Sequence, residues 1–136
     1  MRGHLLGRTH SATYRVQPDQ TAEGYSNTGI AVLATPVLAG YVEETAVLTV
    51  APALAAGEAS VGAHLALNHQ RPTVPGEWVT VTATVTRVEG DDVTFEFTAS
   101  DPARRVANGV HVRRCVAVVR LMAGAHRRAG QATAAP

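Results

Sequence analysis

The sequence predicts an α+β fold in which one long helix packs on one face of an antiparallel sheet of about five strands. The stretch from Thr35 to Thr49 has apolar residues at spacings of three and four, which is typical of an amphipathic helix. Most of the chain from Ala59 to Leu121 instead alternates between apolar and polar side chains, as strands with one buried face do. A single helix beside such a sheet must bury its apolar stripe against it.

The predicted helix has a recognisable start and end. Pro36 suits the first helical turn, and Thr35 before it is a candidate N-cap. Proline breaks a helix interior, so the helix should end near Pro52. Two adjacent carboxylates, Glu43 and Glu44, point about 100° apart, so at most one lies near the middle of the apolar face. The expected apolar face consists of Val37, Leu38, Tyr41, Val42, Thr45 and Leu48.

One strand is expected before the helix and four after it, with a loop over residues 21–30 and a hairpin turn at Gly90. In the strand that ends at His69, strict alternation would place Val61, Ala63, Leu65, Leu67 and His69 on the face toward the helix. A helix wrapped by a curved antiparallel sheet is the hotdog architecture. The expected strands are 10–16, 59–69, 78–88, 93–99 and 106–121.

Length and composition fit one domain, expected over residues 1–122, with a mobile terminus at 1–8 and a disordered tail at 123–136. The net charge of +1 gives no indication of a nucleic-acid partner. A lone cysteine, Cys115, cannot form an intramolecular disulfide, and no metal-ligand motif is present. No apolar run is long enough to cross a membrane and no signal-peptide core is visible, so a cytoplasmic protein without a membrane partner is expected.

Three residues offer the groups that acyl transfer requires. Thr35 supplies a hydroxyl, Glu43 a carboxylate and His69 an imidazole. Taken singly, a glutamate on a helix is commonly a solvated side chain and a histidine at a strand end is commonly structural. No nucleophile elbow, P-loop or dinucleotide-binding motif is present, which removes several common enzyme classes.

The sequence resembles the fluoroacetyl-CoA thioesterase group of hotdog-fold thioesterases over about residues 31–121. The resemblance lies in four runs: ATPVLAGYVEETA, ASVGAHLALNH, PGEWVTVTATVTRVEG and ANGVHVRR. That group uses a Thr, Glu and His triad, and its spacings of eight and twenty-six residues fit Thr35, Glu43 and His69. A glycine seven residues before the histidine fits Gly62, and an H-x-R motif fits His111 and Arg113.

The resemblance implies hydrolysis of an acyl-CoA thioester without a cofactor, since CoA is part of the substrate. In that reading Glu43 attacks the carbonyl or activates water, His69 moves protons and Thr35 orients the carboxylate. The backbone N–H near Gly62 would help to hold the oxyanion, and Arg113 would lie near the site or the CoA entrance. Hotdog thioesterases are at least dimers, so a homodimer or a dimer of dimers is expected.

Two points stay open at the level of sequence. Thr35 and Glu43 are about 12 Å apart along one helix, so they share a site only if the segment before the helix folds back or if two subunits contribute. The aromatic gate of the fluoroacetyl-specific enzyme is also missing, because Ser26 and Gly29 stand where that enzyme has phenylalanines. The resemblance therefore implies a thioesterase with a different acyl group.

Other functions remain compatible with the same residues. One alternative is a thioesterase that releases an acyl group from a carrier protein in a biosynthetic pathway. Another is a non-catalytic acyl-binding hotdog protein, against which the presence of all three triad residues argues. A hotdog hydratase would need an Asp and His pair that is not found around His64 or His69.

Overall fold

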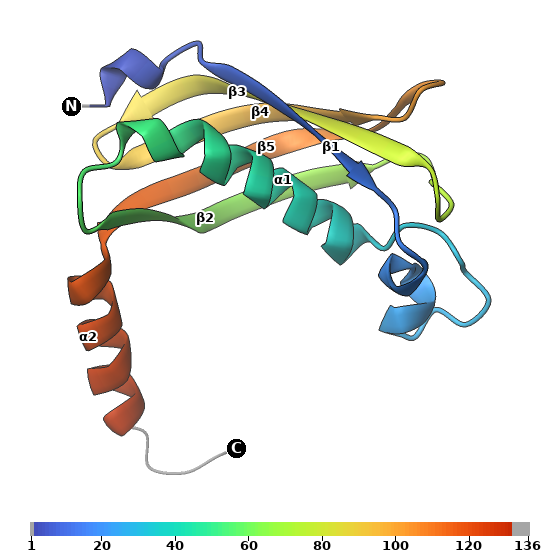
Figure 1. Ribbon diagram of the computed structural model, residues 1–136. Helices are drawn as coiled ribbons and strands as arrows, with labels where there is room; N and C mark the ends of the chain where they lie inside the picture. Colours follow the sequence, from blue (N-terminus) through green and yellow to red (C-terminus); the bar gives the residue numbers. More distant parts are fainter. Residues whose placement is uncertain (1, 132–136) are drawn as a thin grey trace.

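The computed structural model describes residues 2–131 and shows the α+β arrangement predicted from the sequence (Figure 1). A long helix, α1, lies across the concave face of one curved antiparallel sheet of five strands. The strands are β1 (Thr9–Arg15), β2 (Glu58–His69), β3 (Trp78–Glu89), β4 (Asp92–Ser100) and β5 (Arg105–Ala117). The helices are α1 (Thr35–Val50) and α2 (Val118–Gly130), and short 3₁₀ turns cover Gly3–Leu5, Pro18–Gln20, Ala22–Tyr25 and Ala51–Ala53.

The sheet order is β1-β3-β4-β5-β2, which makes β2 a free edge strand. The centre of the sheet supplies the core, since the inward side chains of β3 and β4 are almost fully buried. This confirms the alternation predicted for these two strands. The residues concerned are Val79, Val81, Ala83 and Val85 in β3, and Val93, Phe95, Phe97 and Ala99 in β4.

Helix α1 buries one side against the sheet, as its apolar spacing predicts. The buried residues are Leu38, Tyr41, Val42, Thr45, Ala46, Thr49 and Val50. Leu48, which the sequence placed on this face, is instead 49% exposed, and Val47 beside it is 37% exposed. Helix α1 therefore keeps a partly apolar outer surface.

A β-bulge in β2 corrects the predicted alternation of this strand. The pairing with β5 shifts between Gly62 and His64, so that Ala63 is an extra residue. A bulge reverses which side chains face inward. As a result Gly62 points toward α1 together with Leu65, Leu67 and His69, while Ala63 is exposed.

The N-terminal segment, expected to be mobile, is packed on the domain. Leu5 is fully buried in the core. The Arg2 guanidinium donates to the Glu58 carboxylate at 2.7 Å, which ties the segment to the start of β2. The isolated apolar pair Leu5 and Leu6 was the only signal of this contact in the sequence.

The C-terminal region also differs from the prediction of a long strand followed by a disordered tail. Strand β5 ends at Ala117, and α2 occupies residues through Gly130, with no buried side chain among them. The alanine and arginine content that suggested disorder is equally favourable for a helix. The rest of the predicted tail, residues 132–136, lies outside the described residues. No helix in the described part of the chain is both long and apolar enough to cross a membrane.

Candidate active site

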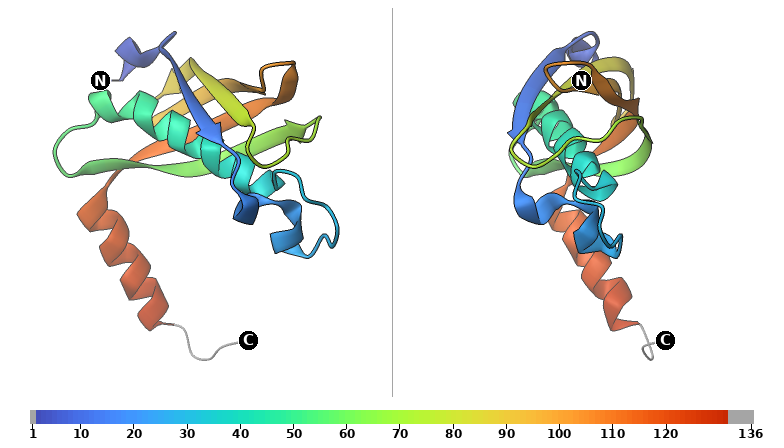
Figure 2. Two further views of the ribbon diagram at one scale, coloured as in Figure 1. Left: turned by 45° about the vertical axis from the view of Figure 1, so that its right-hand side comes forward. Right: turned by 90° about the vertical axis from the view of Figure 1, so that its right-hand side faces the viewer.

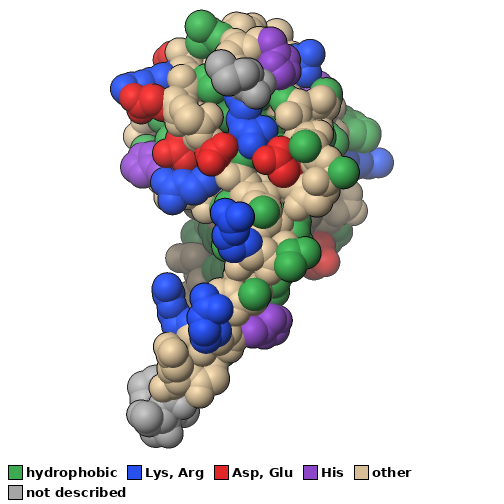
Figure 3. All heavy atoms as spheres, turned by 90° about the vertical axis from the view of Figure 1, so that its left-hand side faces the viewer, with side chains coloured by type: hydrophobic (Ala, Val, Ile, Leu, Met, Phe, Trp, Pro, Cys, Tyr) green, Lys and Arg blue, Asp and Glu red, His purple; other side chains and the backbone are tan. Residues whose placement is uncertain are grey.

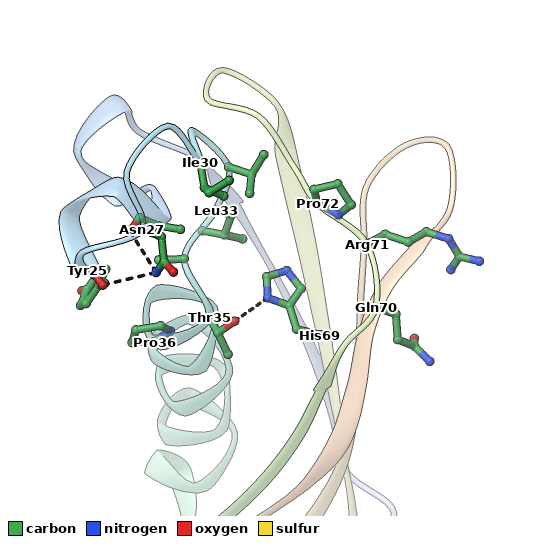
Figure 4. Close-up of a pocket in the computed structure, with 13 residues that line it drawn as sticks. Tyr25, Asn27, Ile30, Leu33, Thr35, Pro36, His69, Gln70, Arg71 and Pro72 are labelled. Carbon is green, nitrogen blue, oxygen red and sulfur yellow. Dashed lines mark hydrogen bonds between the residues drawn. The ribbon is translucent and has the colours of Figure 1, made fainter.

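The first part of the candidate site lies where α1 begins. The Thr35 hydroxyl is 2.8 Å from Nδ1 of His69, the last residue of β2 (Figure 4). Both residues line an open pocket of about 440 Å³, whose other walls come from part of the segment before α1 and from residues 70–72. Ala34 precedes the helix and the Thr35 side chain makes no capping bond, so the predicted N-cap role of Thr35 is wrong and its hydroxyl serves His69 instead.

The environment of His69 favours the neutral imidazole. Burial lowers the pKa of His69 below its ordinary value, and this outweighs an opposing contribution from the backbone at Arg71. The second ring nitrogen, Nε2, is buried and has no hydrogen-bond partner among residues 2–131. A neutral, positioned imidazole with one free nitrogen can accept a proton or receive a hydrogen bond from a further group.

The second part of the candidate site surrounds Glu43 in the middle of α1. Oε1 of Glu43 lies against Gly62 on β2, so closely that a Cβ atom at position 62 would overlap with it. Arg113 of β5 holds the same oxygen in an ion pair of 3.5 Å. The Glu43 side chain remains 47% exposed, whereas that of Arg113 is only 6% exposed. The carboxylate is therefore anchored on one side and open on the other.

Arg113 is itself fixed by groups on two strands. Its Nε donates to Ser60 Oγ at 2.8 Å and one terminal nitrogen donates to the Ser60 carbonyl at 2.9 Å. His111 lies beside it, and Nδ1 of His111 is 2.8 Å from the His64 carbonyl at the bulge. Burial lowers the pKa of His111 and that of Arg113, so this network keeps a neutral imidazole beside a guanidinium.

Within one chain the structure joins two of the three triad candidates. Thr35 and His69 are in contact, whereas no hydrogen bond joins Glu43 to either of them in the described part of the chain. Glu43 lies against Gly62, which stands seven positions before His69, a distance of about 20 Å along β2. The fold-back of the segment before the helix brings Thr35 to His69 without bringing Glu43.

The segment between β1 and α1, residues 18–34, covers the pocket and is called the lid segment below. Two of its side chains are half exposed, Tyr25 at 51% and Ile30 at 50%. The positions of the missing aromatic gate have left-handed backbone, with φ of 72° at Ser26 and 82° at Gly29. A phenylalanine rarely adopts this conformation, so restoring the gate at these two positions would strain the loop.

Ser60 is the residue of the site that the sequence did not indicate. The alternation drawn through Val61 placed Ser60 on the outer face, and the bulge turns it inward to Arg113. A glycine within a strand is a known signal of a bulge, and Gly62 carried that signal.

Solved structures with the same arrangement define the class of this fold. A hot-dog-like protein from Thermanaerovibrio acidaminovorans matches with a TM-score of 0.86 and 28% identity, over 93% of this chain and 96% of its own. A thioesterase superfamily member from Thermus thermophilus has a TM-score of 0.89 at 21% identity, over 96% of this chain and 97% of its own, which supports the fold alone. The protein therefore has the hotdog fold, as the sequence predicted.

Similarity in sequence narrows this class to one family. The family model for fluoroacetyl-CoA-specific thioesterases matches residues 16–119, so the chain belongs to that family of thioester hydrolases. The fluoroacetyl-CoA thioesterase of Streptantibioticus cattleyicolor is 37% identical over 82 residues, which are 60% of this chain and 59% of that enzyme. The match thus spans less than two thirds of this curated relative.

Crystal structures of the fluoroacetyl-CoA-specific thioesterase extend the similarity beyond that aligned stretch. A single-residue variant has a TM-score of 0.85 and 28% identity, over 90% of this chain and 96% of its own. The same variant in complex with fluoroacetate and CoA has a TM-score of 0.81 and 29% identity, over 85% of this chain and 98% of its own.

Proposed function

We propose that this protein hydrolyses acyl-CoA thioesters at sites that two subunits share, with Thr35 and His69 from one subunit and Glu43 and Gly62 from the other. Family membership supports the reaction class. The observation that carries the arrangement is that His69 has a buried nitrogen with no hydrogen-bond partner in the described residues, while Glu43 has an open carboxylate, in two places too far apart to meet within one chain. A buried polar atom without a partner costs about 1–3 kcal/mol, which a second subunit would recover.

The free edge of β2 is the surface on which the two subunits would meet. Edge strands of stable monomers are commonly protected by charged residues, proline or a covering segment. The stretch from Ala59 to Asn68 contains neither proline nor a Lys, Arg, Asp or Glu. Antiparallel pairing of two copies of β2 about a two-fold axis leaves no free edge at this position and runs the Gly62 end of one strand toward the His69 end of the other.

In this arrangement each group has a role that its surroundings suit. The Glu43 carboxylate activates a water molecule or attacks the thioester carbonyl itself, and the ion pair with Arg113 holds it in place. His69 takes up the proton that the attacking water loses and passes it to the CoA sulfur as the carbon–sulfur bond breaks, and Thr35 fixes the orientation of the ring. The backbone N–H near Gly62 stabilises the oxyanion. The scheme uses no cofactor beyond the CoA of the substrate.

The oligomeric state gives a first test. The protein is expected to be a dimer or a dimer of dimers, because a monomer would leave both the β2 edge and the active site incomplete. Light scattering coupled to size-exclusion chromatography measures this directly. A stable monomer at micromolar concentration would contradict the shared site.

The acyl preference follows from the lid segment and the pocket. Ser26 and Gly29 leave the lid without the aromatic gate, and the pocket of about 440 Å³ falls within the range of pockets that bind small molecules. Discrimination between acyl groups that differ by one small substituent is worth only about 1–3 kcal/mol in a simple pocket. We therefore infer a preference for an acyl group larger than fluoroacetyl.

Hydrolysis of a panel of acyl-CoAs tests both the reaction and this preference. The ratio of kcat/KM for fluoroacetyl-CoA over acetyl-CoA is expected to lie below about one hundred, with better activity on a longer or bulkier acyl-CoA. A ratio in the many thousands would show that Tyr25 or Ile30 replaces the gate. Matched carrier-protein thioesters, tested alongside, distinguish the carrier-dependent alternative. Hydrolysis of no thioester in either panel would contradict the proposed function.

A further inference from the structure

Helix α2 has an apolar face that covers nothing in its own subunit. None of its side chains is buried, and Val118, Leu121 and Met122 are 39%, 40% and 45% exposed. At 100° per residue these three lie on one side of the helix together with Ala125. Arg120 and Arg127 lie on the opposite side. A helix with this pattern is stable when its apolar side packs on another surface.

The position of α2 shows which surface that is. A hydrogen bond from Val118 N to the Gly57 carbonyl fixes the start of α2 beside the beginning of β2. From there α2 projects away from the sheet, past the free edge of β2, as Figures 1 and 2 show. The lid segment projects on the same side at the other end of β2. The two elements thus stand at opposite ends of the edge on which the proposed dimer forms.

Two-fold pairing of β2 brings these two elements together across the interface. A register that places Gly62 beside His69 of the partner subunit places Glu58, four residues earlier, close to Thr73 of the partner subunit. Within a subunit the Thr73 carbonyl accepts from Leu33 N at 2.8 Å, so Thr73 is joined to the lid segment. Since α2 begins next to Glu58, it approaches the partner's lid.

Both α2 and the lid segment expose apolar side chains, and the two segments carry opposite net charges. The lid segment exposes Tyr25 and Ile30 and carries two acidic residues, Asp19 and Glu23, without any Lys or Arg in residues 18–34. Helix α2 exposes apolar side chains and has arginines at positions 120, 127 and 128 without any acidic residue. Figure 3 shows arginines and hydrophobic side chains on different sides of the projecting helix.

We propose that α2 of each subunit packs on the lid segment of its partner, so that the acyl pocket of one subunit is closed by the C-terminal helix of the other. This inference rests on the proposed two-subunit site. It assigns α2 an effect on substrate binding, because a lid supported by α2 holds Tyr25 and Ile30 over the pocket that they line. The second copy of the chain, rather than a membrane, is the occupant because two-fold pairing of β2 brings α2 to the partner's lid, where Tyr25 and Ile30 offer an apolar surface.

Chemical cross-linking of the full-length protein tests the contact. A double variant with Ile30→Cys and Met122→Cys is expected to give a covalent dimer with a short bis-maleimide, because the two thiols lie on facing surfaces. Each single variant should give much less. The native Cys115 is buried and its thiol pKa is raised by that burial, so it should react slowly, and the wild-type protein measures that background.

The outcomes separate this inference from the proposed function. A dimer by light scattering without cross-linking of the double variant would overturn the α2 contact and leave the β2 interface in place. A monomeric wild-type protein would overturn both. Recruitment of the wild-type protein to anionic phosphatidylserine vesicles, without cross-linking of the double variant, would show that α2 binds a membrane instead.

A kinetic comparison checks the effect on the lid. Leu121→Glu on the apolar side of α2 is expected to raise KM for the best acyl-CoA by about tenfold or more. A lid without support from α2 would bind the substrate and the transition state less tightly to the same degree, so kcat should change little. Val119→Glu is the matched control, since Val119 is 81% exposed and lies off the apolar side. Equal KM values for the two variants and the wild type would overturn the role of α2 in binding.

Discussion

Mixed dimers of two inactive variants, Glu43→Gln and His69→Ala, are expected to regain thioesterase activity. Each variant alone should lose at least about two orders of magnitude in kcat/KM, the usual contribution of a positioned acid–base group. In a two-fold dimer with shared sites, a heterodimer contains one site with both defects and one site with neither. Random mixing should then restore about a quarter of the wild-type activity.

The measurement requires co-expressed or co-refolded subunits with two different tags, so that the heterodimer can be isolated. Glu44→Gln is a matched control for Glu43→Gln, because Glu44 is the adjacent exposed carboxylate on the same helix. It should retain wild-type activity. Activity of both single variants at the wild-type rate would contradict the catalytic assignment. Inactive single variants without complementation would instead contradict the shared site.

Gly62→Ala is expected to lower kcat/KM about a hundredfold while leaving the fold intact. The new methyl group would occupy the position of the Glu43 Oε1 atom, so the carboxylate must move away from Gly62. A displacement of about 1 Å of a reacting group commonly costs about this factor. Elsewhere in a strand the same exchange commonly stabilises the protein, because glycine is the more flexible residue in the unfolded chain.

Two measurements distinguish this effect from damage to the fold. The melting temperature should stay close to that of the wild type, and the loss should appear in kcat more than in KM. Gly130→Ala is the control, because a methyl group there meets open space at the end of α2. Full activity of Gly62→Ala would show that Glu43 does not act from the position seen beside Gly62.

The elements of this fold could be predicted from the sequence wherever one periodicity extends over a whole element. Strand β3 alternates from Val79 to Val85, and its inward residues there are buried as predicted. The prediction was wrong where local composition is ambiguous. Small residues and arginines suit both a disordered tail and a helix such as α2. The buried N-terminal segment depends on Leu5, whose tertiary contact has no local signal.

The candidate site was less predictable than the fold because it depends on long-range geometry. Spacing along the chain indicated Thr35, Glu43 and His69, but only the structure shows the hydroxyl of Thr35 beside His69. The same spacing did not reveal that Glu43 lies against Gly62 and pairs with Arg113, about 20 Å along β2 from His69. The sequence could not assign these groups to one subunit or to two, because every subunit of a homodimer carries the same residues.

The bulge at Gly62 and His64 determines where β2 tolerates insertion and deletion. A strand normally tolerates a length change at its ends, where a loop absorbs the shift. Removal of Ala63 would restore strict alternation and leave Ser60 facing inward, whereas removal of Val61 would keep the bulge and turn Ser60 to the outer face, away from Arg113. Length in β2 is therefore constrained on either side of the bulge, and variation in length should be confined to Ala63 and to the connecting loops.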